Sequence, residues 1–216
     1  LDGGDGSDRQ MTTQELRDNL LTFILAGHET TALTLAWALY LCAFDPAVQE
    51  AARDEAAGVL GPGRSARPAS AEDVAKLPYT RQIIDEALRL YPPGGFMSRT
   101  AKAPDVLAGH EIQPGDTVSL PVYALHRNHR LWEDPARFRP ERFADRSSID
   151  RFAYLPFGDG PRGCIGASLA IQEAIVILAT LLARFRFTAV PGRVPKPVMI
   201  VTLRPEGGVW LEVQDA

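Results

Sequence analysis

Cysteine is scarce in this sequence, which has two, Cys42 and Cys164, among its 216 residues. Two cysteines so far apart do not make the disulfide framework of a small extracellular scaffold, and their scarcity fits a reducing compartment. We therefore expect a cytoplasmic protein.

Histidine is also scarce, and its positions do not favour a metal site. The chain has four: His28, His110, His126 and His129. Zinc ligands usually repeat at short spacings, and these histidines do not do so with Cys164, so zinc is disfavoured.

A strong charge of either sign is missing as well. Lys and Arg number 23 and Asp and Glu number 27, which gives a formal net charge of −4. This balance predicts no nucleic-acid partner. Apolar residues make up 45% of the chain, enough for a globular domain with a substantial core.

The first residues show no initiator methionine and no basic segment followed by an apolar one, so no signal peptide is visible. Residues 1–11 are rich in Gly and Asp and predict a flexible acidic linker. We expect residues 12–216 to be part of a single domain.

A long helix is predicted after the linker. Thr12 and Glu15 form a capping-box pattern, and the helix can run to about Asp45, before Pro46. The sequence from 20 to 44 is apolar nearly all round, so we expect this helix to lie inside the protein. A membrane span is disfavoured, because an acid at its centre is costly in lipid.

Residues 26–31, with the sequence A-G-H-E-T-T, interrupt this apolar helix. Gly27 would let another group come close, and the Thr30 hydroxyl can bond a carbonyl one turn back. A buried carboxyl at Glu29 beside that hydroxyl would form a proton relay. The alternative is a packing glycine with locally bonded threonines, which six residues do not exclude.

Residues 157–166 place four glycines and a proline around Cys164, directly before a helix predicted over residues 167–185. Helix N-terminal N–H groups and the nearby Arg162 favour a thiolate, which can ligate a metal or attack an electrophile. Gly163 and Gly166 leave room for a flat, bulky group beside the sulfur.

Two other interpretations of Cys164 remain at this point. Most single cysteines near a helix start are small apolar residues without a chemical role. A cysteine hydrolase would use the free N–H groups as an oxyanion hole, but no histidine is evident as its base.

The rest of the chain predicts a mainly helical protein with small β-sheets. Helices are expected after Ser70 and from Tyr79 to about Leu90, and short strands over residues 94–126. Residues 128–152 contain many helix breakers and predict irregular structure. A final β-hairpin is expected from residues 198–203 and 209–213.

Four motifs in this order closely resemble those of cytochrome P-450, the haem-thiolate monooxygenase family. They are A-G-H-E-T-T at 26–31, E-x-x-R at 86–89, P-E-R-F at 140–143 and F-G-x-G-x-R-x-C-x-G at 157–166. The resemblance implies the C-terminal portion of the cytochrome P-450 fold, with a long central helix and a cysteine-ligand loop.

The resemblance also implies a role for each residue of these motifs. Cys164 would be the axial ligand of the iron of haem b, with Phe157 near the sulfur. The other haem-binding residues would be Gly158, Arg162, Gly163, Gly166, Arg99, Ala26 and Gly27, of which Arg99 and Arg162 would face propionates. Glu29 and Thr30 would deliver protons for oxygen activation.

Two further sets of residues follow from the resemblance. Glu86, Arg89 and Arg142 would form a structural ion network behind the haem; taken by itself, the Glu86–Arg89 spacing also fits an ordinary surface pair. The residues expected to contact substrate are Pro93, Gly94, Gly95, Phe96 and Met97. Core packing is the alternative for Phe96 and Met97.

The implied activity is insertion of one oxygen atom of O2 into an apolar substrate such as a fatty acid. A ferredoxin or flavin reductase would supply the electrons, as in bacterial soluble members. The alternatives are a haem-thiolate sensor, which does not need Glu29 and Thr30, and an inactive fragment. Family members are about twice as long, so we expect this chain to resemble a C-terminal half that is poorly soluble and inactive by itself.

Overall fold

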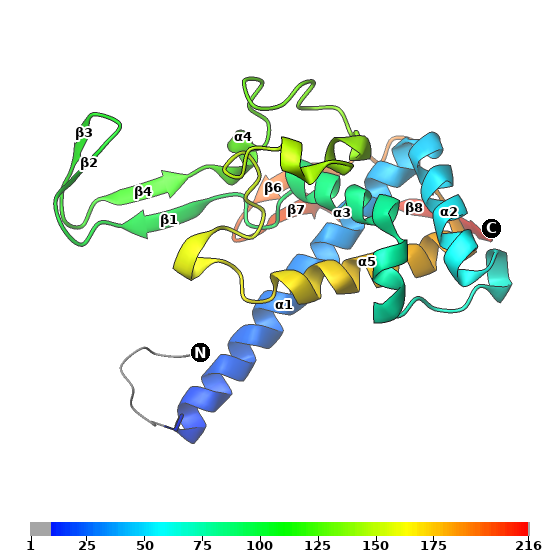
Figure 1. Cartoon of the computed structure of the whole chain (residues 1–216), viewed down its shortest axis with the longest axis horizontal. Coiled ribbons are helices and arrows are strands. Elements are labelled where there is room, and N and C mark those ends of the chain that lie inside the picture. The colour runs from blue at the N-terminus through cyan, green and yellow to red at the C-terminus, as the bar shows by residue number, and fades with distance from the viewer. Residues whose placement is uncertain (1–9, 216) are drawn as a thin grey trace.

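The computed structural model describes residues 10–215, and these form a helical body with thin β extensions (Figure 1). Most of the predicted linker, residues 1–9, lies outside the described residues. The α-helices are α1 (Thr13–Phe44), α2 (Pro46–Leu60), α3 (Pro78–Leu90), α4 (Val122–Leu125) and α5 (Ala167–Arg184). The 3₁₀ helices are η1 (Gly63–Ser65), η2 (Ala71–Lys76), η3 (Pro140–Phe143), η4 (Arg146–Ser148) and η5 (Gly160–Arg162).

The strands form small antiparallel sheets of two strands each. They are β1 (Met97–Thr100), β2 (Asp105–Leu107), β3 (His110–Ile112), β4 (Thr117–Leu120), β5 (Phe185–Ala189), β6 (Lys196–Met199), β7 (Leu203–Glu206) and β8 (Leu211–Asp215). The pairs are β1–β4, β2–β3, β5–β8 and β6–β7. The prediction of a mainly helical protein with small sheets is confirmed.

The long helix predicted at the start of the chain is α1, and its limits follow from capping. The Thr12 hydroxyl accepts a hydrogen bond from the Glu15 N–H, and the Glu15 carboxylate accepts one from the Thr12 N–H at 2.8 Å. At the other end the Asp45 carboxylate caps α2, where Pro46 is the first residue. The chain bends by 114° between the two helices.

Only the second half of α1 is buried. Trp37, Ala38 and Cys42 are in the core, whereas Ile24 and Leu25 are 64% and 74% exposed. We call residues 13–29 the α1 arm; Figure 1 shows it extending beyond the body. The expectation that residues 20–44 lie inside the protein is therefore wrong for the arm, because no described element packs over it.

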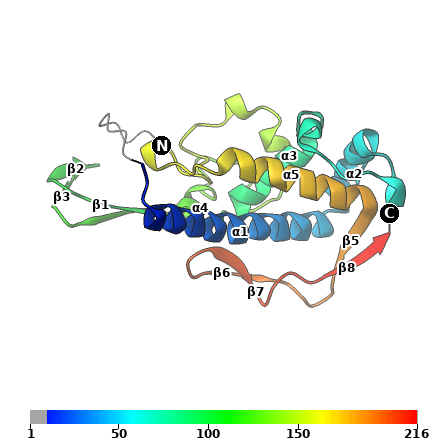
Figure 2. The same cartoon turned by 90° about the horizontal axis from the view of Figure 1, so that it is seen from below.

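The body is built around α5, which packs against α1; Figure 2 shows α5 on one side of α1 and strands β6, β7 and β8 on the other. Ile175, Leu178 and Leu182 of α5 are fully buried against α1, α2 and α3. Burying each such side chain contributes roughly 1.5–3 kcal/mol. Among the described residues, α5 is also the one unbroken helix that is long and apolar enough to cross a membrane, a property that the central helix of a folded domain shares.

The C-terminal strands pair differently from the prediction. β6 pairs with β7 across residues 200–202, and β8 returns to pair with β5 next to α5. Gly207 and Gly208, at φ +74° and +82°, turn the chain from one sheet toward the other. The predicted hairpin around residues 205–208 is wrong, because Pro205 lies within β7 and faces Pro197.

Candidate haem site

The Cys loop, residues 157–166, is held by its own backbone. The Cys164 N–H donates to the Phe157 carbonyl at 2.8 Å, and the Gly163 N–H donates to the Gly160 carbonyl at 2.9 Å. The two cysteines contrast: Cys164 is exposed, whereas burial raises the pKa of the Cys42 thiol to about 12. Of the two, Cys164 is the thiol that a ligand can reach.

Glycine is required at Gly158 for two reasons. Its φ of +70° lies in the left-handed region, and a Cβ there would come within 3.1 Å of the Met97 sulfur. Gly166 leaves space near the thiol, since its Cβ would lie 3.9 Å from Cys164 Sγ. These positions keep the loop tight and the sulfur accessible.

The N-terminus of α5 adds a favourable field beside the sulfur. The helix begins at Ala167, and its N-cap, Gly166, offers no side-chain acceptor to the first turn. The first turn of α5, with its N–H groups and the positive end of the helix dipole, therefore begins three residues after Cys164.

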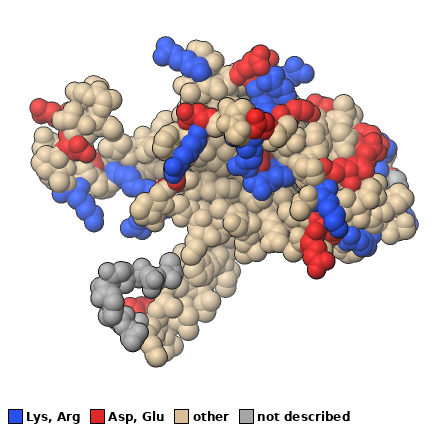
Figure 3. All heavy atoms as spheres, viewed as in Figure 1, with Lys and Arg blue, Asp and Glu red and all other residues tan. Residues whose placement is uncertain are grey.

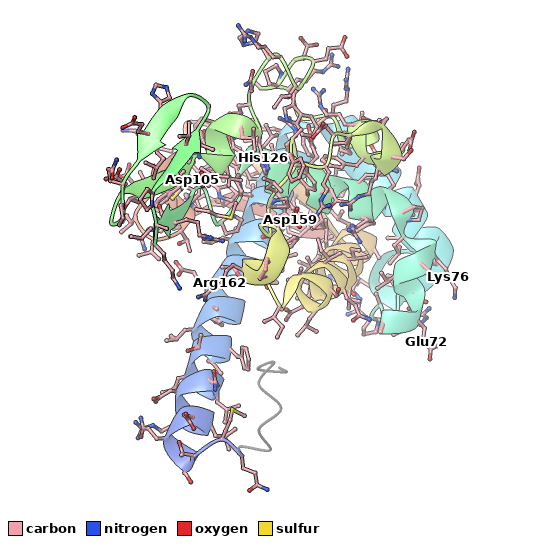
Figure 4. All side chains as sticks on the ribbon, turned by 60° about the vertical axis from the view of Figure 1, so that its left-hand side comes forward. Glu72, Lys76, Asp105, His126, Asp159 and Arg162 are labelled. Carbon is pink, nitrogen blue, oxygen red and sulfur yellow. The ribbon has the colours of Figure 1, made fainter. Side chains whose placement is uncertain are left out.

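Two arginines near the loop keep their charge available. Asp159 is engaged by Arg151 at 2.6 Å, and this bond lowers the Asp159 pKa. Among the described residues, Arg162 and Arg99 form no ion pair; Arg99 donates to the Ser98 carbonyl at 2.9 Å. Figure 4 labels Asp159 and Arg162 on the yellow loop.

A small cavity connects Arg99 with the loop. Its volume is about 190 Å³, and its lining residues are Met97, Arg99, Leu120, Phe152, Leu155 and Asp159. It lies where β1 and β4 approach the Cys loop. A carboxylate of a bound group could therefore meet the Arg99 guanidinium at the edge of this loop.

The centre of α1 has the local geometry that its sequence predicts. The Thr30 hydroxyl donates to the Ala26 carbonyl at 2.8 Å, and Thr34 bonds the Thr30 carbonyl in the same way at 2.9 Å. A Cβ on Gly27 would have no neighbour within 4 Å. The helix surface at Gly27 is thus open in this structure.

The exposure of Glu29 differs from the prediction. Its carboxylate is exposed rather than buried, because the α1 arm is not covered by any described element. It accepts a hydrogen bond of 3.0 Å from the hydroxyl of Thr202, in the turn between β6 and β7. Sequence reasoning missed Thr202, which is a common residue in an unremarkable apolar stretch.

The predicted ion network is present, and its Glu86–Arg89 pair is fully buried. Arg89 binds Glu86 through two contacts of 2.6 and 2.8 Å, and both side chains are 0% exposed. Arg142 Nε lies 3.3 Å from the same Glu86 carboxylate. The structure thus brings Glu86, Arg89 and Arg142 together.

Arg89 also organises the irregular segment that follows α4. Its guanidinium donates to the carbonyls of His126 and Pro135 at 2.8 Å each, and to that of Arg137 at 3.2 Å. The Trp132 ring lies 5.1 Å from the guanidinium carbon. One cation thus satisfies carbonyls that have no helix or sheet to pair with.

Residues 93–97 lead from the end of α3 into β1. The Pro93 carbonyl accepts from the Leu203 N–H at 2.9 Å, and a Cβ on Gly95 would lie 1.9 Å from the Met199 methyl carbon. Phe96 is 52% exposed, so core packing is not its role in this structure. Met97 contacts the loop at Gly158.

The described residues contain no group of three or more His, Cys, Asp or Glu side chains that could enclose a metal. A metal at Cys164 would therefore take its other ligands from a group that carries them. An accessible thiol on a glycine-shaped loop, two unpaired guanidiniums and an open helix surface at Gly27 fit a haem with one axial protein ligand. These features define a haem-thiolate protein.

Sequence comparison agrees that this is a haem-thiolate protein and identifies its family. The family model of cytochrome P-450 matches residues 2–211 of the chain. The chain belongs to the cytochrome P-450 family, whose members bind haem b and are haem-thiolate monooxygenases.

Individual relatives come from distant organisms. The chain is 36% identical over 208 residues to taurochenodeoxycholic 6 alpha-hydroxylase of Sus scrofa, covering 94% of this chain and 40% of that protein. It is 40% identical over 197 residues to cytokinin hydroxylase of Arabidopsis thaliana, covering 91% and 38%. A putative cytochrome P-450 132 of Mycobacterium bovis is 40% identical over 198 residues, covering 91% and 42%. The chain thus spans about 40% of the length of these relatives.

Proposed function

We propose that this chain carries the haem-binding and oxygen-activating part of a monooxygenase that inserts one atom of O2 into an apolar organic substrate. The observation that carries the proposal is the exposed Cys164 on its glycine-shaped loop directly before α5, in a chain whose α1 also bears Gly27, Glu29 and Thr30.

Each residue around this site has a separate task. Haem would supply the redox chemistry, and the Cys164 thiolate would donate electron density to its iron. Arg99 and Arg162 would bind its carboxylates, for which charge-assisted hydrogen bonds are well suited. Ala26 and Gly27, with no bulky side chain, would leave space for the flat group against α1.

Glu29 and Thr30 would hold and move protons. The Thr30 hydroxyl hydrogen is directed to the Ala26 carbonyl, which leaves its oxygen able to accept another hydrogen bond. The Glu29 carboxylate is oriented by Thr202. An acid with an adjacent hydroxyl can pass a proton inward from solvent, a form of general acid–base catalysis.

The proposed substrate is apolar, because Phe96 and Met97 offer apolar surface next to the Cys loop. Two relatives are named as hydroxylases of a bile acid and of cytokinins, which supports hydroxylation. A fatty acid is one candidate of this class. We also propose that a ferredoxin or flavin reductase delivers two electrons, and that the protein is cytoplasmic and of bacterial type.

A haem-thiolate binding or sensor protein is the second candidate. It would keep the Cys loop and the Glu86–Arg89 pair, which serve binding and folding. It would not need a carboxylate held beside Thr30 in the middle of a helix. The Glu29–Thr202 bond therefore favours the monooxygenase.

The test uses protein expressed from its complete reading frame. The reduced protein should show the red-shifted carbon monoxide band of a thiolate-ligated haem, Cys164→His should lose it, and Cys42→Ser should keep it. Oxygen from isotopically labelled O2 should appear in an apolar product. An unchanged band in Cys164→His overturns the ligand assignment, and haem binding without any product supports the sensor.

A further inference from the structure

A buried imidazole joins the Glu86–Arg89 pair to the chain that leads into the Cys loop. His126, directly after α4, is 0% exposed. Its Nδ1 lies 3.2 Å from the Arg89 carbonyl oxygen, and its Nε2 lies 2.8 Å from the Leu155 backbone nitrogen. Figure 4 labels His126 together with Asp159 and Arg162 of the Cys loop.

These two contacts fix the protonation state of the ring. A carbonyl oxygen can only accept, so Nδ1 must carry the hydrogen that His126 donates to Arg89. A backbone N–H can only donate, so Nε2 must be the unprotonated acceptor for Leu155. The ring therefore fits this site only as the neutral Nδ1–H tautomer, and burial, which lowers the His126 pKa to about 4, keeps it neutral.

The link to Arg89 runs in both directions. The Arg89 guanidinium donates to the His126 carbonyl at 2.8 Å, while the His126 ring bonds the Arg89 carbonyl. Around the ring lie the Arg127 guanidinium, whose charge also disfavours a second proton, and the Tyr154 ring at 5.3 Å between centroids. The position of the ring is therefore set by the same buried network that holds α3.

From the ring, hydrogen bonds continue to the cysteine. The Leu155 carbonyl accepts from the Gly158 N–H at 3.2 Å, and the Phe157 carbonyl accepts from the Cys164 N–H at 2.8 Å. Leu155 also lines the small cavity that holds Arg99. A displacement of Leu155 would thus shift both the thiolate and a haem-facing arginine.

We propose that His126 is a positioning residue for Cys164: by holding the Leu155 N–H, it sets the position of the Cys loop, and so of the thiolate, relative to α3. This inference rests on the proposed function of Cys164 as a haem ligand. Outer partners of metal ligands commonly change metal affinity by about 10–100-fold when they are removed.

The mutational test compares three holoprotein variants. His126→Phe keeps an aromatic ring at this position but loses the hydrogen bonds to Arg89 and Leu155. His126→Gln can still present an amide oxygen to the Leu155 N–H. His129→Phe is the control, because His129 is exposed. We expect His126→Phe to lose haem about tenfold faster and to lose thiolate ligation in the folded, haem-loaded fraction. His126→Gln should restore most of the thiolate band, and the control should match the wild type.

Two measurements on the wild-type protein test the hydrogen bonds of His126 directly and do not depend on haem ligation or activity. Nitrogen NMR of labelled histidine should show the Nδ1–H tautomer for His126, and the Leu155 amide should exchange slowly with solvent. An Nε2–H tautomer, or wild-type haem retention and thiolate band in folded His126→Phe, overturns the inference. If His126→Phe does not fold, the inference is tested by the thiolate band of His126→Gln and by the tautomer of His126 in the wild type. A wild type without any thiolate band refutes the proposed function instead.

Discussion

The Thr202 hydroxyl donates a hydrogen bond of 3.0 Å to the Glu29 carboxylate and so joins the turn between β6 and β7 to the middle of α1. The two residues are 173 positions apart in the chain. Glu29 is exposed, so this bond is what gives its side chain a defined direction. The proposed proton donor is therefore oriented from outside its own helix.

Thr202→Val should remove this orientation while keeping the shape of the side chain. A hydrogen bond of this kind is worth about 1 kcal/mol, which corresponds to about a fivefold loss in coupling of electron use to product. Haem content should not change. Peroxide release per electron pair measures the effect, with Thr188→Val, an exposed threonine of β5, as the control. Full coupling in Thr202→Val would remove Thr202 from the proton path.

Arg89→Ala should prevent folding rather than slow a folded enzyme. It would leave Glu86 buried and several carbonyls without a donor, at a cost of about 3–5 kcal/mol, a large share of the stability of a typical domain. The measurement is soluble, haem-loaded yield together with urea unfolding. Arg130→Ala, at an exposed site, should behave like the wild type. A stable, haem-replete but slow Arg89→Ala protein would contradict a structural role.

Gly27→Ala separates a packing glycine from a haem-facing one. Because no atom lies within 4 Å of the added carbon, the haem-free protein should not be destabilised, and alanine favours a helix by about 1 kcal/mol. Haem affinity should fall about fivefold or more, since overpacking costs roughly 1–3 kcal/mol. Gly58→Ala in α2, which is equally open, is the matched control. Equal haem affinity in both variants would argue against haem at Gly27.

Acid should destabilise the fold through His126. Burial lowers its pKa from 6.5 to about 4, so the unfolded chain takes up a proton that the folded protein refuses. The free energy of unfolding is therefore unaffected by His126 above pH 6.5. It decreases as the pH falls from 6.5 to about 4, by roughly 3 kcal/mol in total. Urea unfolding at pH 7 and pH 4.5 measures it. His126→Gln should show a smaller difference than His129→Gln, and equal differences would contradict this.

Local features of the site could be predicted from the sequence because short motifs determine them. The glycines around Cys164 set the loop, the hydroxyl of Thr30 finds the carbonyl one turn back, and Glu86 and Arg89 share a helical face. Such contacts need only the geometry of a turn or a helix. For this reason the Cys loop and the ion pair were the most predictable parts of the molecule.

Long-range contacts could not be predicted in the same way. Nothing in the sequence around His126 shows that Arg89 and Leu155 bind its ring, since both lie far from it along the chain. The pairing of the last strands depends on β8 returning to β5 beside α5, which the turn residues do not reveal. Likewise the apolar pattern of α1 predicts a buried helix but does not say which element must bury it.

The α1 arm is mostly uncharged on the face seen in Figure 3, and its side chains are largely exposed up to Glu29, which Thr202 binds. A helix without tertiary contacts is only marginally stable in water, so the arm lies near the balance between helix and coil. Gly27, Glu29 and Thr30 lie where packed turns give way to unpacked ones. A group that binds between Cys164 and the arm would shift that balance toward helix. Cofactor affinity would therefore include the entropy of ordering the arm, and the proposed proton donor would become ordered in the same event.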